Sequence, residues 1–357
     1  MKENDHQQSA ASSGPHPASI LIVKLRYLGD VLLATPVVQT VRAAYPSARI
    51  TMIVNAGTEP VLAANPNVDE VLALERGTLA AQWRFLARLR RRRFDLAIDL
   101  TDGDRSAFLS WMSAARVRIG FNAEGRLRGR AYTTVVQSPP GSHRVERDLS
   151  VLRPLGLVHA DTIPRIWLTA DDEHQAEELL HRAGVGRHHS FAIIQPGARY
   201  WFKAWPPERF AALADRLSDD YGYQVLIGGT SEEEGLAQNI IGRAKSRPVS
   251  LTGIADIRTF AAVLKRARLF VGNDSGAMHL AAAVGTPLVA LFGPSDPKEW
   301  GPRGGRAEIL YKGLDCRTCF HPTCRRGEQN CMRLISSEEV VDSVRRVTGG
   351  ALSKEQR

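Results

Sequence analysis

Residues 269–293 gather side chains that could bind an anion at a strand-to-helix turn. An apolar run ends at Asp274, and Ser275, Gly276 and a helix of small residues with His279 in its first turn follow. Free amides at a helix N-terminus attract phosphate, whereas a carboxylate at the same point repels it. We therefore expect Asp274 to cap the helix or accept hydroxyl protons instead of facing the anion. The alternative is a well-capped helix with a core histidine.

A second strand-to-helix turn could supply a general base. Gly29 allows a tight turn after the apolar run of residues 19–25, and Asp30 comes at the start of an amphipathic helix. A carboxylate at the mouth of a sheet can accept a proton during group transfer. A carboxylate at this position is also a common helix cap, so the spacing leaves both interpretations open.

Loop cations form the third candidate site. A strand ends near Gly197, a loop carries Arg199 and Lys203, and a helix begins after Trp205 with two prolines, which suit a first helical turn. Cations beside a helix start can hold a diphosphate. The alternative is a surface loop that the tryptophan anchors.

Two glutamates follow another predicted strand. Glu232 and Glu233 lie in the first turn of the next helix, where acidic side chains suit the helix dipole. A carboxylate at such a position can also bind ribose hydroxyls. The sequence contains neither G-x-G-x-x-G nor a P-loop, so a standard dinucleotide or NTPase site is not indicated.

All four cysteines of the chain fall within 16 residues, at the spacing C-x2-C-x4-C-x6-C. In a reducing compartment this favours a tetrahedral structural metal site, for Zn or Fe, over two disulfides, although the spacing matches no standard zinc finger. Free thiols are the alternative, and His321 is a spare candidate ligand. The candidate ligands are Cys316, Cys319, Cys324 and Cys331.

These residues need a scaffold that brings strand ends together. Apolar runs of strand length alternate with helical stretches in two successive series, which predicts an α/β chain with two doubly wound, Rossmann-like parallel-sheet domains facing across a cleft. A helix is expected after each run but the last, at residues 58–66 after the second. The predicted strands are residues 19–25, 49–55, 94–100, 190–197, 223–229, 248–253, 268–274 and 287–293. We expect the first domain to span residues 19–165 and the second, which includes the cysteine-rich segment, residues 166–335. Residues 1–18 are predicted to be a disordered tail, and residues 336–357 a C-terminal helix and tail.

Composition limits the kind of partner. The 357 residues carry a net charge of +9, which favours an anionic partner. The arginine run of residues 88–93 is either a solvated helix end or a patch for acidic lipid head groups. Aromatic residues are not interleaved with it, so a nucleic-acid partner is not expected. Glycine and proline interrupt the apolar residues 276–293, and no signal peptide is evident, so we expect a cytoplasmic protein.

Taken together, these motifs resemble the bacterial ADP-heptose:lipopolysaccharide heptosyltransferases, from about residue 19 to about residue 347. The segments that carry the resemblance are KLRYLGDVLLATPV, QPGARYWFKAWPPERF, LIGGTSEEE and VGNDSGAMHLAAAVGTPLVALFGPSDPKEWGP. The stretch DLTDGDRSAFLSW and the cysteine tail are most similar to the heptosyltransferase III branch. The family implies a GT-B fold, with an N-terminal acceptor domain and a C-terminal donor domain, and inverting transfer of heptose from ADP-L-glycero-β-D-manno-heptose.

The resemblance also implies roles for individual residues. The family's catalytic base falls on Asp30, its diphosphate-binding lysine on Lys203 and its ribose-binding carboxylate on Glu232 or Glu233. Its donor motif falls on Asp274, Ser275, Gly276 and His279, so we expect the amides of Ser275 and Gly276 to hold the ADP diphosphate. Many family members have hydroxyl side chains where this chain has Gly197 and Ala198, so backbone amides would make the contact there, beside Arg199.

The implied acceptor is a phosphorylated Kdo and heptose core of lipopolysaccharide, presented at the inner face of the inner membrane. We expect Lys24, Arg26 and Arg105 to meet this acceptor and the enzyme to be peripheral on that membrane. No catalytic cofactor is required, because Lys203 and a helix N-terminus can stabilise the leaving group. Related autotransporter heptosyltransferases are similar in holding a metal with a four-cysteine cluster. A protein acceptor and a non-catalytic sugar-nucleotide-binding protein are the alternatives.

Overall fold

The computed structural model describes residues 16–75, 77–159, 161–186, 189–316 and 324–350. Most of the predicted N-terminal tail therefore lies outside the described residues, as do the last seven residues of the chain. So do Cys319 and His321 of the cysteine-rich segment.

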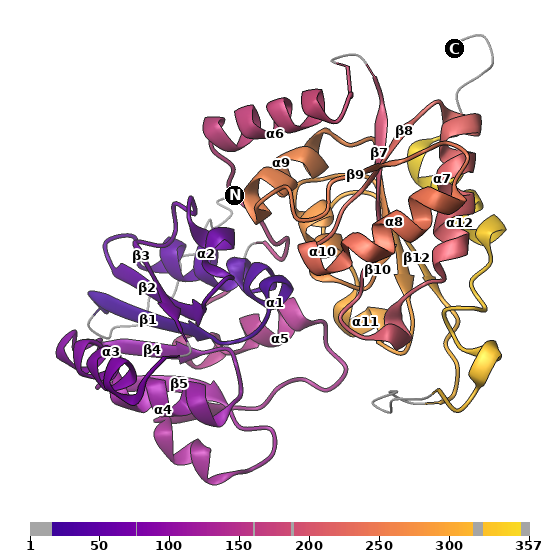
Figure 1. The fold of residues 1–357 in the computed structure, drawn as a ribbon. Coiled ribbons are helices and arrows are strands. Elements are labelled where there is room, and N and C mark those ends of the chain that lie inside the picture. The colour runs from indigo at the N-terminus through magenta and orange to yellow at the C-terminus, as the bar shows by residue number, and fades with distance from the viewer. Residues whose placement is uncertain (1–15, 76, 160, 187–188, 317–323, 351–357) are drawn as a thin grey trace, which may run out of the picture.

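The first half of the chain forms a six-stranded parallel sheet in the order β3-β2-β1-β4-β5-β6 (Figure 1). Its central strands are short apolar runs that are buried on both faces, as parallel strands covered by helices must be. The strands are β1 (Ser19–Lys24), β2 (Arg49–Asn55), β3 (Glu70–Leu74), β4 (Leu96–Asp99), β5 (Val117–Phe121) and β6 (Thr134–Val136).

The second half repeats this architecture with a parallel sheet in the order β12-β11-β10-β7-β8-β9. In both sheets the strand order reverses next to the first strand of the half, β1 or β7, and such a reversal opens a crevice at the carboxyl ends of the strands. The strands are β7 (Phe191–Gln195), β8 (Gln224–Ile227), β9 (Val249–Ser250), β10 (Leu269–Asn273), β11 (Leu288–Phe292) and β12 (Ala307–Tyr311).

Helices connect the strands and cover both faces of each sheet. Those of the first half are α1 (Leu28–Leu33), α2 (Thr35–Ala44), α3 (Leu79–Arg91), α4 (Asp104–Met112) and α5 (Arg144–Ser150). Those of the second half are α6 (Ala170–Arg182), α7 (Pro207–Tyr221), α8 (Glu234–Arg243), α9 (Ile257–Arg266), α10 (Gly276–Ala283), α11 (Pro297–Trp300) and α12 (Ser337–Thr348). The α/β class and the two doubly wound sheets predicted from the sequence are confirmed.

Some elements differ from the prediction. Residues 58–66, after β2, were expected to be a helix but form only the 3-10 turn η1 (Glu59–Leu62), because Pro66 disfavours a helical conformation at Asn65 and β3 begins at Glu70. Four strands, β3, β5, β6 and β12, had no counterpart among the predicted strands. The apolar residues 276–293 divide into α10 and β11, and no helix of the described residues is both long and apolar enough to cross a membrane.

The two faces of the first sheet have different partners. Alternate residues of β1 point to opposite faces, so Leu21 and Val23 pack under α3 and α4, whereas Ile20 and Ile22 pack under α1 and α2. The hydrophobic core formed by Ile20, Ile22, α1 and α2 continues into the other half through α6, α9 and α10. Helices α3 and α4 therefore cover the face that does not join the second half.

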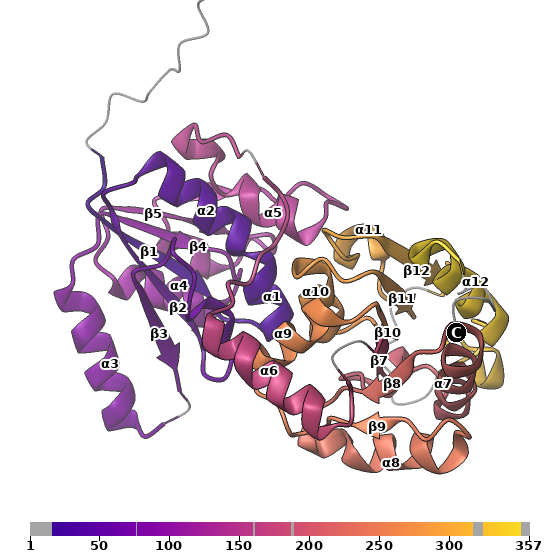
Figure 2. The same ribbon diagram turned by 90° about the horizontal axis from the view of Figure 1, so that it is seen from above.

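The halves touch through two pairs of helices that lie side by side in both views (Figures 1 and 2). Helix α1 packs against α10, and the start of α5 contacts the end of α11, where the His143 ring nitrogen Nε2 lies 2.9 Å from the Gly301 carbonyl oxygen. These contacts set the distance between the two strand-end crevices. The predicted boundary at residues 165–166 falls in the connection before α6 and stays a prediction.

Candidate active site

A cleft of about 830 Å³ lies between the two halves, at the carboxyl ends of the central strands of both sheets. Most of the residues singled out from the sequence meet here, although they come from four separate strand-to-helix connections. From the first half the cleft receives Gly29 and Asp30. From the second half it receives Gly197, Arg199, Lys203, Glu233, Asp274, Ser275, Gly276 and His279.

Asp30 stands on the first-half wall of this cleft. It is the third residue of α1, and its Oδ2 accepts a hydrogen bond of 3.4 Å from the Tyr27 backbone N–H. The carboxylate is therefore both a helix cap and a cleft residue, so the two interpretations of the sequence do not exclude each other.

Lys203 and Asp274 form an ion pair on the opposite wall, with Nζ 2.6 Å from Oδ2. Lys203 is brought there by the 3-10 turn η4 (Trp201–Lys203) after β7, and Asp274 directly follows β10. The Asp274 side chain is only 7% exposed, so its charge needs the lysine as a partner. Asp274 therefore organises the turn through Lys203 instead of capping α10.

Asn273 ties the two loops together, a role that the sequence analysis missed. Its Oδ1 accepts from the Trp205 backbone N–H at 3.1 Å, and its Nδ2 donates to the Pro196 carbonyl at 2.7 Å. The fully buried Trp205 donates its indole N–H to the Ile335 carbonyl, which fixes the start of α7. An asparagine at the end of a buried strand was the available signal, because a buried amide must find partners for both of its ends.

The N-terminus of α10 opens into the cleft without a side-chain cap. Ser275 is its N-cap in an extended conformation but caps no amide, and its hydroxyl oxygen is buried without a partner in the described part of the chain. Gly276 adds no side chain that would cover the first amides. These donors and the positive end of the helix dipole suit an anion.

His279 is buried one turn further along α10 and still lines the cleft. Burial lowers its pKa to about 4, which outweighs the opposite effect of the Asp274 carboxylate. The imidazole is therefore neutral at physiological pH, and its Nδ1 has no hydrogen-bond partner among the described residues. Its Cδ2 would lie 3.1 Å from a Cβ built on Gly29, so the glycine permits the close approach of α1 to α10.

Of the two glutamates before α8, only Glu233 lines the cleft. The Glu233 carboxylate lines the cleft, where it accepts hydrogen bonds from the Thr230 backbone N–H at 2.9 Å and the Gln195 side chain at 3.3 Å. It lies directly over Gly197, where a Cβ would be 1.8 Å from Glu233 Oε1. Glu232 is exposed and does not line the cleft.

A smaller cleft of about 690 Å³ continues from the first one over the first sheet. The two share Tyr27, whose ring faces the Arg199 guanidinium across the main cleft with 3.1 Å between the guanidinium carbon and the ring centroid. Arg26 and Arg105, both predicted to meet an anionic acceptor, line this smaller cleft.

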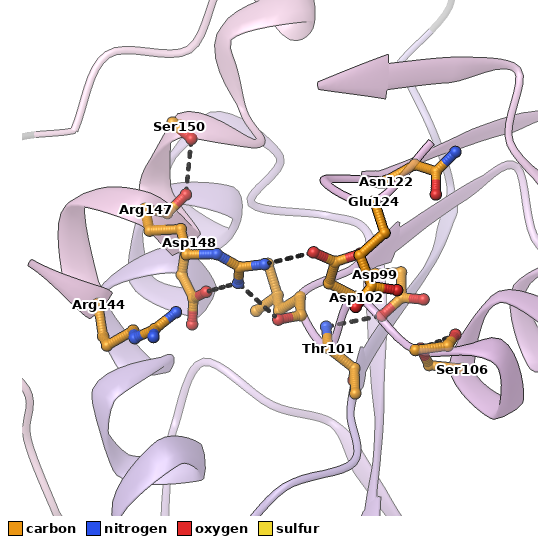
Figure 3. A network of polar contacts seen from close by, with 12 residues as sticks. Asp99, Thr101, Asp102, Ser106, Asn122, Glu124, Arg144, Arg147, Asp148 and Ser150 are labelled. Atoms are coloured by element: carbon orange, nitrogen blue, oxygen red, sulfur yellow. Dashed lines mark hydrogen bonds and ion pairs between the residues drawn. The ribbon is translucent and has the colours of Figure 1, made fainter. Parts of the chain in front are cut away.

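Lys24 lines neither cleft. Its ammonium is buried beneath them, 2.5 Å from Asp148 Oδ2 and within hydrogen-bond distance of the Leu100 carbonyl. The same network continues through Arg147, which reaches between Asp148 and Asp102 at 3.3 and 3.1 Å (Figure 3). Because each of these buried charges has a partner, the network can hold the floor of the smaller cleft rigidly.

The three cysteines that the structure describes do not line the cleft. Cys316, Cys324 and Cys331 are partly buried, and Arg326 donates to the Cys316 sulfur at 3.3 Å. In the residues that the structure describes, no three His, Cys, Asp or Glu side chains form a group that could hold a metal ion. Cys319 lies outside those residues, so the four-cysteine metal site stays a prediction.

The cleft thus places one carboxylate opposite a lysine and an open helix N-terminus. A carboxylate can accept a proton from an attacking hydroxyl, and positive groups across the cleft can stabilise a diphosphate that leaves. This arrangement is suited to group transfer from a diphosphate-activated donor.

Comparisons with known proteins identify relatives of this chain. The sequence model of glycosyltransferase family 9 (heptosyltransferase) matches residues 82–329. Lipopolysaccharide heptosyltransferase 3 of Escherichia coli K12 is 34% identical over 289 residues, which cover 78% of this chain and 83% of that protein.

Solved structures agree on the fold. A family 9 glycosyltransferase from Veillonella parvula superposes with a TM-score of 0.81 at 26% identity, over 93% of this chain and 97% of that one. The E. coli heptosyltransferase WaaC, solved with ADP, gives 0.73 at 22% identity, over 92% and 99%. The fold is therefore of the GT-B kind, as expected, and the relatives include the heptosyltransferase III branch. This chain belongs to glycosyltransferase family 9, the heptosyltransferases.

Proposed function

We propose that the protein transfers heptose from ADP-L-glycero-β-D-manno-heptose to a sugar hydroxyl of the lipopolysaccharide inner core, with inversion at the anomeric carbon. The observation that carries this proposal is the position of Asp30 opposite Lys203 and the α10 N-terminus in one cleft. The names of the relatives support the substrate class, since one is a lipopolysaccharide heptosyltransferase and another was solved with ADP.

In the proposed reaction Asp30 accepts the proton of the acceptor hydroxyl. The acceptor oxygen then forms a bond to the anomeric carbon from one face while the bond to the ADP oxygen breaks on the other. Lys203 and the amides of Ser275 and Gly276 stabilise the charge that develops on the departing diphosphate. These groups can do so without a divalent ion.

The remaining residues of the cleft position the two substrates. Glu233 is suited to bind the ribose hydroxyls of the donor, and Arg199 flanks the diphosphate. Arg26 and Arg105 bind the carboxylates and phosphates of the acceptor in the smaller cleft, whereas Lys24 supports that cleft from beneath. Because this acceptor is attached to a lipid, we place the enzyme on the cytoplasmic side of the inner membrane as a peripheral protein.

Replacing Asp30 by asparagine tests the base. We expect turnover to fall by about 10²- to 10⁴-fold, the usual contribution of general base catalysis, while the affinity for ADP stays the same. Asp171→Asn, the same change on the exposed start of α6, is the matched control. Transfer assays with a purified core acceptor and ADP titrations would measure both quantities. Normal turnover by the Asp30→Asn variant would refute the assignment.

The cysteine cluster is a second part of the proposal. We propose that Cys316, Cys319, Cys324 and Cys331 bind one structural Zn or Fe ion, which takes no part in the transfer. Elemental analysis of protein purified without added metal should give close to one ion per chain. Less than ~0.1 ion per chain, together with four titratable thiols, would rule out a stable site.

A further inference from the structure

An apolar groove of about 960 Å³ lies on the first half, between α4 and the 3-10 turn η2 (Leu127–Ala131). Its floor and walls are formed by Ala107, Phe108, Trp111, Leu127 and Ala131. Arg126, Arg128 and Arg130 surround it. Neither the sequence motifs nor the proposed reaction assigns a role to this groove.

Large apolar side chains of the groove stay exposed after the fold is complete. Phe108 is 45%, Trp111 51% and Leu127 77% exposed, and the rings of Phe108 and Trp111 lie 6.0 Å apart. The inner side of α4 is occupied by other residues, among them the buried Leu109, which packs on the first sheet. The aromatic pair therefore contributes little to the core, and an adjoining exposed patch of this kind marks an interaction surface.

Three arginines and three carboxylates, Asp102, Asp104 and Glu124, surround the groove. Arg128 is paired with Asp102 at 2.9 Å and Arg126 with Glu124 at 2.5 Å, whereas the exposed Arg130 has no ion pair in the described ranges of the chain. The excess of positive charge on this side of the molecule therefore comes from Arg130 and from the neighbouring helix α3. Helix α3 lies beside α4 on the same face of the sheet and adds Trp83, which is 66% exposed. It also adds a row of exposed arginines at 84, 88, 90 and 91.

The groove is next to the smaller cleft. Asp104, at the start of α4, lines both, so a ligand in the cleft beside Arg105 lies one helix turn from the groove. If that cleft binds the sugars of a lipid-linked acceptor, as the proposed function holds, the groove faces the side from which the lipid arrives. This part of the argument rests on the proposed function, whereas the apolar and cationic character of the surface does not.

We propose that the α4–η2 groove seats the protein on the surface of an anionic phospholipid bilayer. Trp111, Phe108 and Leu127 enter the interface, where amphipathic rings are favoured, and Arg126 and Arg130 contact lipid phosphates. Charge favours a bilayer over a second copy of this chain as the occupant. The exposed arginines of α3, with Arg126 and Arg130, outnumber the exposed Asp104 and Glu124, so a two-fold contact through this surface would bring a surplus of positive charge together.

Vesicle sedimentation tests the proposal without any substrate. The full chain should bind vesicles of phosphatidylcholine and phosphatidylglycerol at 3:1, and bind pure phosphatidylcholine much less. The double variant Arg126→Glu/Arg130→Glu should lose at least about 30-fold in affinity for the anionic vesicles. The triple variant Phe108→Ser/Trp111→Ser/Leu127→Ser should lose at least about tenfold at the same charge. The control Arg243→Glu/Lys245→Glu, at the exposed end of α8, makes the same charge change on the second half. Its loss of affinity for the anionic vesicles should be less than half of the loss seen with Arg126→Glu/Arg130→Glu.

Transfer to a soluble, deacylated core acceptor separates this proposal from the proposed function. The groove variants should keep that activity, which also shows that they fold. The proposal would be overturned if the control lost as much vesicle binding as Arg126→Glu/Arg130→Glu, or if both groove variants bound vesicles as well as the wild type. It would also be overturned if the wild-type chain dimerised in solution and the triple variant did not, since a second copy would then occupy the groove. Loss of transfer in the wild-type protein itself, with vesicle binding intact, would refute only the proposed function.

Discussion

Glu232 and Glu233 are identical neighbours in the sequence, yet only the second faces the cleft. Their difference comes from the capping interaction with the Thr230 backbone, which turns the Glu233 carboxylate back toward Gly197. We expect Glu233→Gln to raise the KM for the donor about tenfold, because a charged hydrogen bond to the ribose becomes a neutral one. Glu232→Gln is the matched control and should leave KM unchanged. Steady-state kinetics with varied ADP-heptose would decide, and equal effects of both changes would remove the assignment.

At the residue scale, the sequence predicted which side chains come together in the cleft but not which partners they pair with. Asp30, Lys203 and Asp274 could be chosen because each follows a predicted strand, and strand ends meet at one edge of a parallel sheet. The burial of Lys24 and its pairing with Asp148 could not be predicted, since these residues are 124 positions apart. Nor could the pairing of Lys203 with Asp274, which depends on how two loops fold over the same strand ends.

At the element scale, the end of β7 packs directly against the turn before α8, because Gly197 leaves room for the Glu233 carboxylate. Gly197→Ala would place a methyl group where the Glu233 carboxylate now lies, so the carboxylate must leave the cleft. We expect the donor KM to rise about tenfold, and the double variant Gly197→Ala/Glu233→Gln to be no worse than either change alone, because both remove one interaction. Kinetics of the three variants would measure this, and additive losses would contradict it.

Gly242→Ala is the control for the glycine substitution. This glycine lies near the end of α8 with open space where a Cβ would extend. Alanine there should raise the free energy of unfolding by about 0.5–1 kcal/mol, because it favours the helix, and should leave the donor KM unchanged. Urea unfolding of the same preparations would show it.

Most elements were predictable where the chain is strongly patterned. Central strands such as β1 and β10 are continuous apolar runs because helices cover both of their faces. Strands β3 and β12 were missed because they lie at sheet edges and are only partly buried. Strand β5 was missed because its apolar residues alternate with Arg118 and Gly120 and form no continuous run, and β6 was missed because it has only three residues. Their pairing depends on the neighbouring strands, which a local pattern does not contain.

At the scale of the whole molecule, His143 joins the two halves. Its Nδ1 accepts the Val145 backbone N–H as a helix cap, so the neutral ring carries its proton on Nε2 and donates it to the Gly301 carbonyl. Burial lowers the pKa of this histidine below its usual value of about 6.5. A second proton would have to enter at Nδ1 and would break the cap.

The sign of the pH dependence follows from this lowered pKa. The unfolded chain takes up the proton first, so the contribution of His143 to stability is complete above about pH 6.5 and is lost as the pH falls below it. At pH 7.5 we expect His143→Asn, which keeps a capping side chain, to cost about 1–3 kcal/mol because the buried Gly301 carbonyl loses its donor. That difference from the wild type should shrink by pH 5.

Urea unfolding at both pH values would measure this effect. His174→Asn removes an exposed histidine on α6 and should change stability at neither pH. A deficit of His143→Asn that is constant between pH 7.5 and pH 5 would show that this histidine does not titrate as described. No sequence pattern pointed to His143, because its partner lies 158 residues away in the other half.

The contact of α1 with α10 has a consequence for how such an enzyme can change. Gly29 and Gly276 let the two helices approach almost backbone to backbone, so the spacing between the carboxylate and the helix end that it faces is set by rigid elements. Arg26 and Arg105 lie outside this contact. Mutations there can alter acceptor preference without disturbing the reacting geometry. An engineer who wishes to redirect the enzyme should therefore diversify the surface loops of the first half and leave the two glycines untouched.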